Sequence, residues 1–118
     1  MRYMMLYKTS QDSSAPPSQE EMTNMGAFIQ EMAAAGVLLQ TDGLQDSSKG
    51  VRVRAAGGKF TVTDGPFTES KELVAGFAIV QVTSKDEAVH WAKRFLTIAG
   101  DGESEVREMY DAPAFPPG

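Results

Sequence analysis

The most apolar segment of the chain is LVAGFAIVQV, residues 73–82. Successive side chains of a strand point to opposite faces, and here both sets are apolar: one contains Phe77 and Ile79, the other Val80 and Val82. A strand that is apolar on both faces is covered on both faces in the folded protein. The sequence therefore predicts a central strand at this position, buried between two layers.

Capping sequences predict two helices. Ser84 and Glu87 follow the central strand and form a capping-box pair, in which each satisfies a free backbone N–H at a helix start. A second pair, Ser18 and Glu21, begins an earlier helix. The glycines expected to end these helices are Gly36 and Gly100. The inner stripe of the first helix contains Met22, Met25, Ile29, Met32 and Ala33, with Phe28 beside it.

Shorter alternating segments predict the remaining strands. They are residues 2–8, 37–41, 51–54, 60–63 and 106–110. The two segments on either side of Gly57-Gly58 are expected to form a hairpin. The order of elements predicts an α+β, ferredoxin-like fold, with an antiparallel sheet and both helices on one face. A single domain is expected over residues 1–112, followed by a loosely packed Pro-rich tail at 113–118.

The coverage of the sheet predicts an oligomer. The first strand, residues 2–8, is also apolar on both faces, because Tyr3 and Met5 alternate with Met4 and Leu6. Two helices cover only one face, and the other would be a larger apolar patch than monomers usually expose. A second copy about a two-fold axis covers it most simply. We therefore expect a homodimer, with sheets back to back or closed into an α/β-barrel-like assembly, and a cleft at the interface.

Composition and charge exclude several functions. The 118-residue chain has a net charge of −5, which disfavours nucleic acid as a partner. It has no cysteine, which removes disulfides, thiolate catalysis and cysteine-ligated metals. No segment approaches the roughly 20 apolar residues of a membrane helix, and the N-terminus lacks a signal-peptide core. The sequence predicts a cytoplasmic protein without cofactor or membrane partner, and no metal site, although carboxylates alone can hold Mg²⁺.

Asp64 is the main candidate for chemistry. It ends a strand and precedes Gly65-Pro66, which fix a tight turn. A carboxylate held there can act as a general base, or it can simply accept hydrogen bonds from its own turn. Asp42 ends the preceding strand. If the strand ends adjoin, the two carboxylates form a pair in which repulsion raises one pKa; the alternative is two turn aspartates that never meet.

Four further residues are candidates for substrate binding. Lys71 can anchor an anionic group or pair with Glu69 or Glu72, although such a charged segment is also typical of a solvated turn. Phe67 closes the tight turn, and Met25 belongs to the methionine stripe, which indicates core or pocket lining. His90, the single histidine, is predicted on the outer face of the second helix.

The segment VTDGPFTESKELVAGF, residues 62–77, resembles the hallmark of the YCII-related family in its DGPF branch. The likeness continues, in order and spacing, at residues 34–39, 43–44, 47–54 and 88–94. It covers nearly the whole chain. The resemblance implies a ferredoxin-like domain that dimerises through its sheets, and an enzymatic role around a His and an Asp.

Asp64 matches the Asp that the resemblance implies, whereas the His has no counterpart in the first helix. Related DGPF sequences have Glu-Gly-Leu-His-Pro where this chain has DGLQD, residues 42–46. The absence of both histidines argues against an imidazole-based mechanism. Similar chains are often encoded near alternative sigma factors, which implies a non-enzymatic alternative.

Three functions follow from these observations. The first is a small-molecule site near the dimer cleft, with lyase or isomerase chemistry in which Asp64 is acid or base, Asp42 its partner and Lys71 an anion anchor. The second is a non-catalytic regulatory module linked to sigma-factor-dependent transcription. The third is a dimeric scaffold whose ancestral site has decayed. The rigid turn at Asp64, beside an apolar strand, favours the first by a small margin.

Overall fold

A computed structural model describes residues 1–9, 17–67 and 73–111 of the chain. In chain order the elements are β1 (Arg2–Thr9), α1 (Gln19–Ala34), β2 (Leu38–Gly43), the short 3₁₀ helix η1 (Ser47–Lys49), β3 (Val51–Ala56), β4 (Lys59–Asp64), β5 (Leu73–Gln81), α2 (Lys85–Ala99) and β6 (Glu103–Glu108). The tail expected at residues 113–118 lies outside the described residues.

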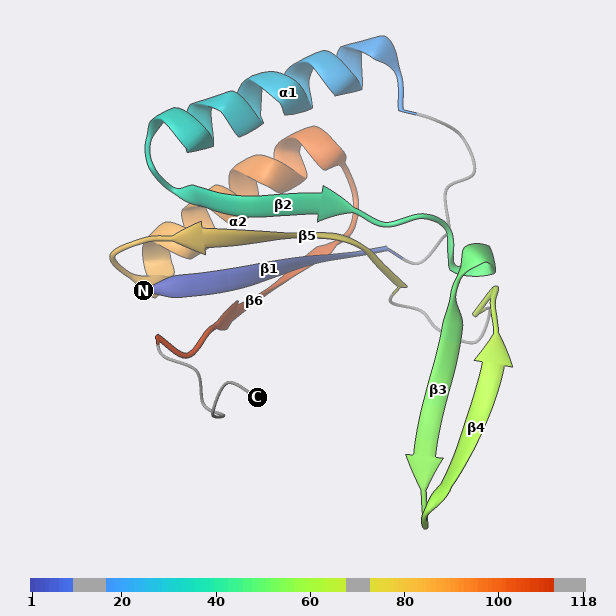
Figure 1. The fold of residues 1–118 in the computed structure, drawn as a ribbon. Coiled ribbons are helices and arrows are strands. Elements are labelled where there is room, and N and C mark those ends of the chain that lie inside the picture. Colours follow the sequence, from blue (N-terminus) through green and yellow to red (C-terminus); the bar gives the residue numbers. More distant parts are fainter. Residues whose placement is uncertain (10–16, 68–72, 112–118) are drawn as a thin grey trace.

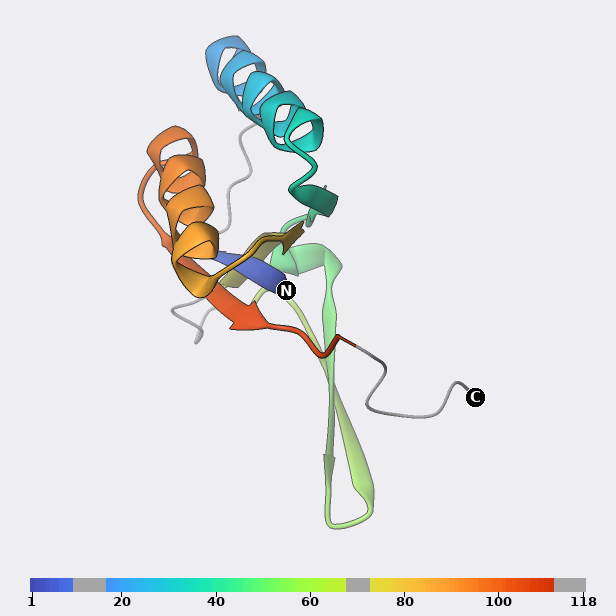
Figure 2. The same ribbon diagram turned by 90° about the vertical axis from the view of Figure 1, so that its left-hand side faces the viewer.

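Four strands form the main sheet, in the order β2-β5-β1-β6, and every neighbouring pair is antiparallel. Both helices lie on the same face of this sheet (Figures 1 and 2). This arrangement confirms the predicted α+β, ferredoxin-like fold. Strands β3 and β4 pair only with each other among the described strands, and their hairpin projects away from the main sheet (Figure 1).

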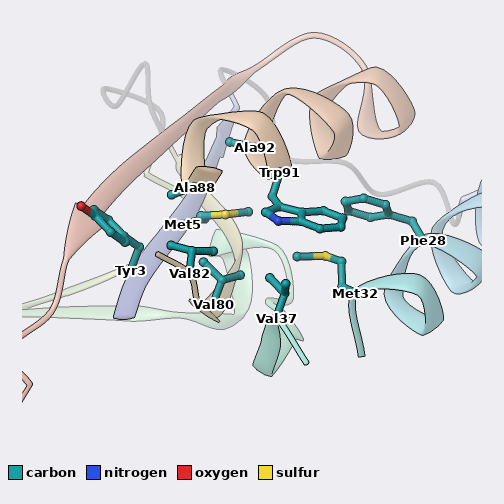
Figure 3. Close-up of a cluster of buried hydrophobic side chains, with 10 residues drawn as sticks. All are labelled: Tyr3, Met5, Phe28, Met32, Val37, Val80, Val82, Ala88, Trp91 and Ala92. Carbon is teal, nitrogen blue, oxygen red and sulfur yellow. The ribbon is translucent and has the colours of Figure 1, made fainter. Parts of the chain in front are cut away.

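The core lies between the helices and the sheet (Figure 3). Val80 of β5 is completely buried, and Tyr3 and Met5 of β1 lie beside it with less than 5% of their surface exposed. The helices contribute Phe28 and Trp91, whose ring centroids are 6.0 Å apart. The alternation predicted for the two central strands is therefore correct for the face that the helices cover.

Both helices begin where the capping sequences predict. Ser18 Oγ accepts a hydrogen bond from the Glu21 amide at 3.1 Å, and Ser84 Oγ accepts one from the Glu87 amide at 3.1 Å. The Glu87 carboxylate accepts the amide of Thr83 at 2.9 Å, one residue before the cap. These bonds satisfy N–H groups that have no partner within a helix. The glycines that follow the helices with positive φ are Gly36 (74°) and Gly100 (93°).

Every strand differs from its predicted bounds by one to three residues, and β2 and β6 show the reason. Asp42, expected in a turn, is a strand residue of β2, because the sheet pairing continues to it opposite Phe77. β6 was predicted over residues 106–110, but it begins at Glu103, which pairs with Lys8 of β1. In both cases the neighbouring strand extends the ladder beyond the apolar residues that marked it in the sequence.

Only the second half of α1 packs onto the sheet. Phe28 and Met32 are buried and Met25 is partly buried, whereas Met22 is 50% exposed. The predicted inner stripe is therefore correct from Met25 to Met32 and wrong at its two ends, because Met22 and Ala33 are exposed. His90 is exposed on α2, as predicted.

Two ion pairs tie elements of the fold together and make its stability depend on pH. Arg94 of α2 forms two hydrogen bonds with the Glu31 carboxylate of α1, and these lower the pKa of Glu31. The Lys8 ammonium lies 2.6 Å from a Glu105 oxygen, joining β1 to β6, and this hydrogen bond lowers the pKa of Glu105. A carboxyl whose pKa is lowered by folding stabilises the folded state above its unfolded pKa, and that stabilisation is lost as pH falls through the folded value.

We therefore expect the free energy of unfolding to fall as the pH is lowered from about 5 to about 3. The measurement is urea denaturation across this range at low salt. Glu31→Gln should lower stability at pH 7 and flatten the decline at acid pH, because the titrating group is gone. Both pairs are partly exposed, so added salt should reduce the difference between variant and wild type. A Glu31→Gln curve parallel to the wild-type curve would contradict the assignment.

Candidate functional site

A cavity of about 400 Å³ lies between the two helices and the main sheet. Its lining is mostly apolar. The residues that dominate its walls are Met5, Tyr7, Met25, Phe28, Met32 and Phe95. The rings of Tyr7 and Phe95 meet edge to face, with centroids 5.2 Å apart, and join β1 to α2. The volume lies within the range of small-molecule sites, about 300–1,000 Å³.

The cavity has two causes. The sheet residues that line it have short side chains, and the first half of α1 does not pack against the sheet. Gly43 of β2 and three small residues of β5, Ala75, Gly76 and Ala78, line it. Above them, the first half of α1 buries no side chain. Close packing is the normal condition of a protein interior, so a space of this size inside a small domain requires an explanation.

Three hydroxyl groups border the cavity. The Tyr7 hydroxyl donates to the Asp101 carbonyl at 3.0 Å, and the Thr41 hydroxyl donates to the Phe77 carbonyl at 2.9 Å. The Ser104 hydroxyl is buried and has no hydrogen-bond partner within the part of the chain that the structure describes. A buried hydroxyl without a partner costs free energy, which a hydrogen bond from a ligand would recover.

Asp42 borders the cavity through its position on the edge strand β2. Thr41 pairs with Ala78 and Asp42 pairs with Phe77, so the strand alternation places Thr41 on the helix side and Asp42 on the opposite face. The Gln40 amide lies 3.5 Å from the Asp42 carboxylate, which agrees with their common face. The carboxylate therefore belongs to the face of the sheet that the helices leave uncovered.

Asp64 and Phe67 lie at the base of the β3–β4 hairpin. Asp64 pairs with Val51 at the end of β4. The Phe67 amide donates to Ser47 Oγ at 3.2 Å, and the Arg52 guanidinium lies 3.8 Å from the centre of the Phe67 ring. These contacts fix the hairpin to η1, so the observed role of Phe67 is structural.

The structure thus separates the predicted site residues. Met25 and Asp42 border the cavity, whereas Asp64 and Phe67 lie at the hairpin base in a different sheet. No hydrogen bond or ion pair joins the two aspartates in the described parts of the chain. Glu69 and Lys71 lie outside the described residues.

Ser104 and the aromatic pair of Tyr7 and Phe95 were not predicted as site residues. Tyr7 and Phe95 carry ordinary core signatures, a strand alternation and a helix stripe. Ser104 precedes the segment predicted as the last strand, and nothing in the sequence marks it. These three residues line the same cavity only because β1, α2 and β6 come together in the folded chain.

The described residues offer neither a cluster of metal ligands nor a membrane-spanning helix. No group of three or more His, Asp or Glu side chains among residues 1–9, 17–67 and 73–111 is placed to hold a metal ion. No helix in those ranges has the length and apolar character needed to cross a membrane.

The fold and the cavity define this protein as a ferredoxin-like α+β domain with a space between its helices and its sheet. Residues 1–112 match the YCII-related domain, and the chain belongs to that family. It is similar to an uncharacterised protein of Rhizobium meliloti (strain 1021), with 30% identity over 114 residues that cover 92% of each chain. The relative has no stated activity, so the comparison gives the family and no function.

Proposed function

We propose that this YCII-related protein binds a small, largely apolar molecule in the cavity between α1 and the main sheet. The observation that carries the proposal is a space of about 400 Å³ with mostly apolar walls and one buried hydroxyl, Ser104, without a described partner. An apolar ligand would gain free energy by removing its own surface and that of the walls from water. The hydroxyl would orient it through one hydrogen bond.

The lining also indicates the charge of the ligand. Among the described residues, no Lys, Arg or His borders the cavity, and Asp42 carries the one acidic side chain that does. Because strand alternation places that carboxylate on the other face, the interior offers no charged partner. A charged ligand group would lose its hydration without compensation. The ligand class is therefore neutral, with an apolar body and one hydrogen-bonding group.

Proton-transfer chemistry remains a separate hypothesis. It needs Asp42 and Asp64 to face one substrate, and within a single chain they belong to different sheets. Only a second copy of the chain would bring them to a common cleft. Binding needs no such rearrangement, so the geometry supports binding better than lyase or isomerase chemistry.

A second copy is itself part of the proposal. Met4, Leu6, Phe77 and Ile79 lie on the face of the main sheet opposite the helices, which we call the open sheet face. None of the four is fully buried in the single chain. A homodimer that covers this face would remove them from water, as the coverage argument from the sequence requires.

The test uses the neutral apolar fluorophore N-phenyl-1-naphthylamine. We expect the wild-type protein to bind it with increased, blue-shifted emission and to melt at a higher temperature in its presence. Ala78→Phe fills the floor of the cavity and should abolish both effects. The matched control, Ala27→Phe, places the same ring on the exposed face of α1 and should bind as the wild type does.

Circular dichroism shows whether each variant retains its fold. Folded Ala78→Phe that binds the probe with wild-type affinity would remove the cavity from the binding function. Ser104→Ala keeps the space and removes the hydroxyl. It should leave binding of this probe nearly unchanged and weaken binding of 1-naphthol, which carries a hydroxyl of its own.

A further inference from the structure

The β3–β4 hairpin, residues 51–64, is the most exposed of the described elements, and we call it the arm. Every residue of its two strands is exposed. It projects from the body in both views (Figures 1 and 2). The Cα radius of gyration is 16.2 Å, whereas a compact domain of this size has about 13 Å. The arm contributes to this extension, because it places mass far from the core.

The arm has two chemically different faces. The register pairs Val53 with Val62 and Ala55 with Phe60 on one face, and Arg52 with Thr63 and Arg54 with Thr61 on the other. The first face, which we call the apolar face, contains Val51, Val53, Ala55, Phe60 and Val62, with Asp64 opposite Val51 at the base of the arm. Three of these are more than 60% exposed: Val53 at 64%, Phe60 at 76% and Val62 at 65%. The arm thus has the alternation of a strand pair with one buried face, but none of the described residues of the single chain buries it.

A free arm of this kind would be unstable. An isolated two-stranded hairpin is at best marginally stable in water, and it needs a further strand or a packed surface. The tight Gly57-Gly58 turn, with φ of 58° and 79°, fixes the register but supplies no burial. The order of the arm therefore requires a surface that residues 1–9, 17–67 and 73–111 of its own chain do not provide.

We propose that the apolar face of the arm docks on the open sheet face of a second copy of this chain. The inference rests on the second copy proposed above and identifies the segment that covers its sheet. In a two-fold dimer the exchange is reciprocal, so each arm lies on the partner's sheet and each sheet is covered. The arm projects away from its own sheet (Figure 1), so intrachain docking would require it to fold back.

The distribution of charge along the chain favours a second copy as the partner of the arm. Arg52, Arg54 and Lys59 against Asp64 give the arm a net charge of +2. Since the whole chain has −5, the remaining residues carry −7. The arm of one copy is therefore attracted to the body of another, and its apolar face matches the apolar side chains Met4, Leu6, Phe77 and Ile79. The basic face of the docked arm remains in solvent.

The first test measures the dimer dissociation constant by analytical ultracentrifugation. Phe60→Ser should raise it about 30-fold or more, because a buried aromatic at the centre of an interface is a typical hot spot. The control is Thr61→Ala, a truncation at the next residue on the basic face, which should leave the constant within about threefold. The urea unfolding midpoint measured at dilutions where the wild type is monomeric should not change for either variant.

Each other outcome contradicts a distinct statement. A wild-type chain that sediments as a monomer at micromolar concentration overturns both the second copy and the docked arm. A wild-type dimer that Phe60→Ser leaves intact overturns the arm alone. Loss of monomer stability in Phe60→Ser would mean that the arm folds onto its own chain, which also overturns the proposal. None of these outcomes bears on the cavity, whose probe is read separately.

The second test locates the arm on the partner. Because the chain contains no cysteine, any introduced thiol is the single one in its chain. A mixture of Val62→Cys and Ile79→Cys chains, treated with a short bis-maleimide, should give a covalent dimer of one chain of each kind. Linkage of Val62→Cys chains only to each other would place arm against arm and overturn the sheet face as the docking surface.

Discussion

Met32→Ala is expected to lower the free energy of unfolding by about 3 kcal/mol, whereas Met22→Ala should change it by less than about 0.5 kcal/mol. The two methionines lie on the same helix, so the substitutions remove the same atoms with the same change in helix propensity. Met32 is 2% exposed and Met22 is 50% exposed. The difference is therefore the cost of leaving a space in the core.

The expected loss is a large fraction of the stability of a domain of this size, about 5–15 kcal/mol. Urea denaturation of both variants, monitored by the fluorescence of the single Trp91 beside the substituted site, measures it. Equal losses at the two positions would mean that the whole of α1 packs on the sheet. In that case the cavity under its first half would not exist in solution.

Gly65→Ala is also expected to lower the free energy of unfolding by about 3 kcal/mol or more, but by a different mechanism. A Cβ at this position would lie 1.6 Å from the Ser47 carbonyl oxygen and 2.6 Å from its carbonyl carbon. Both atoms belong to the backbone, so no side-chain rotation relieves the overlap. The base of the arm must then separate from η1, and the hydrogen bond from the Gly65 amide to the Gly50 carbonyl, 3.0 Å, is lost with it.

Gly50→Ala is the matched control. Its Cβ would face the same Ser47 oxygen at 3.4 Å, an ordinary contact, and a change of at most about 1 kcal/mol is expected. Urea unfolding gives the two free energies, and amide chemical shifts of residues 47–50 report on the joint. A Gly65→Ala protein with wild-type stability and unchanged shifts at these amides would refute the close approach of the two segments.

Local chemistry in the sequence was enough to predict the fold. The serine caps at Ser18 and Ser84, the apolar alternation of β1 and β5, and the Gly57-Gly58 turn each have a short-range cause. Each agrees with the others, and together they leave one common topology. The ends of β2 and β6 were missed because pairing with a neighbour, which is a long-range effect, decided them.

The candidate site was less predictable, for a physical reason. A cavity is defined by what does not pack, and the periodicity of α1 shows which face is apolar without showing how much of it meets the sheet. The importance of Gly65 was anticipated, but on the ground that it frees the backbone. In the structure its φ is not positive, and the need is for space beside Ser47. A close approach between two segments 18 residues apart leaves no recognisable local pattern in the sequence.

The position of the arm within the chain has a consequence for how members of this family diverge. β2 and β5 are antiparallel neighbours, so a short turn would suffice to connect them, and the whole stretch 44–72 is inserted at that corner. Insertions there leave the ladder and the hydrophobic interior untouched. Sequence changes in this appendage can therefore change its length or charge without altering the cavity beneath α1, because the two regions share no lining residue among those described.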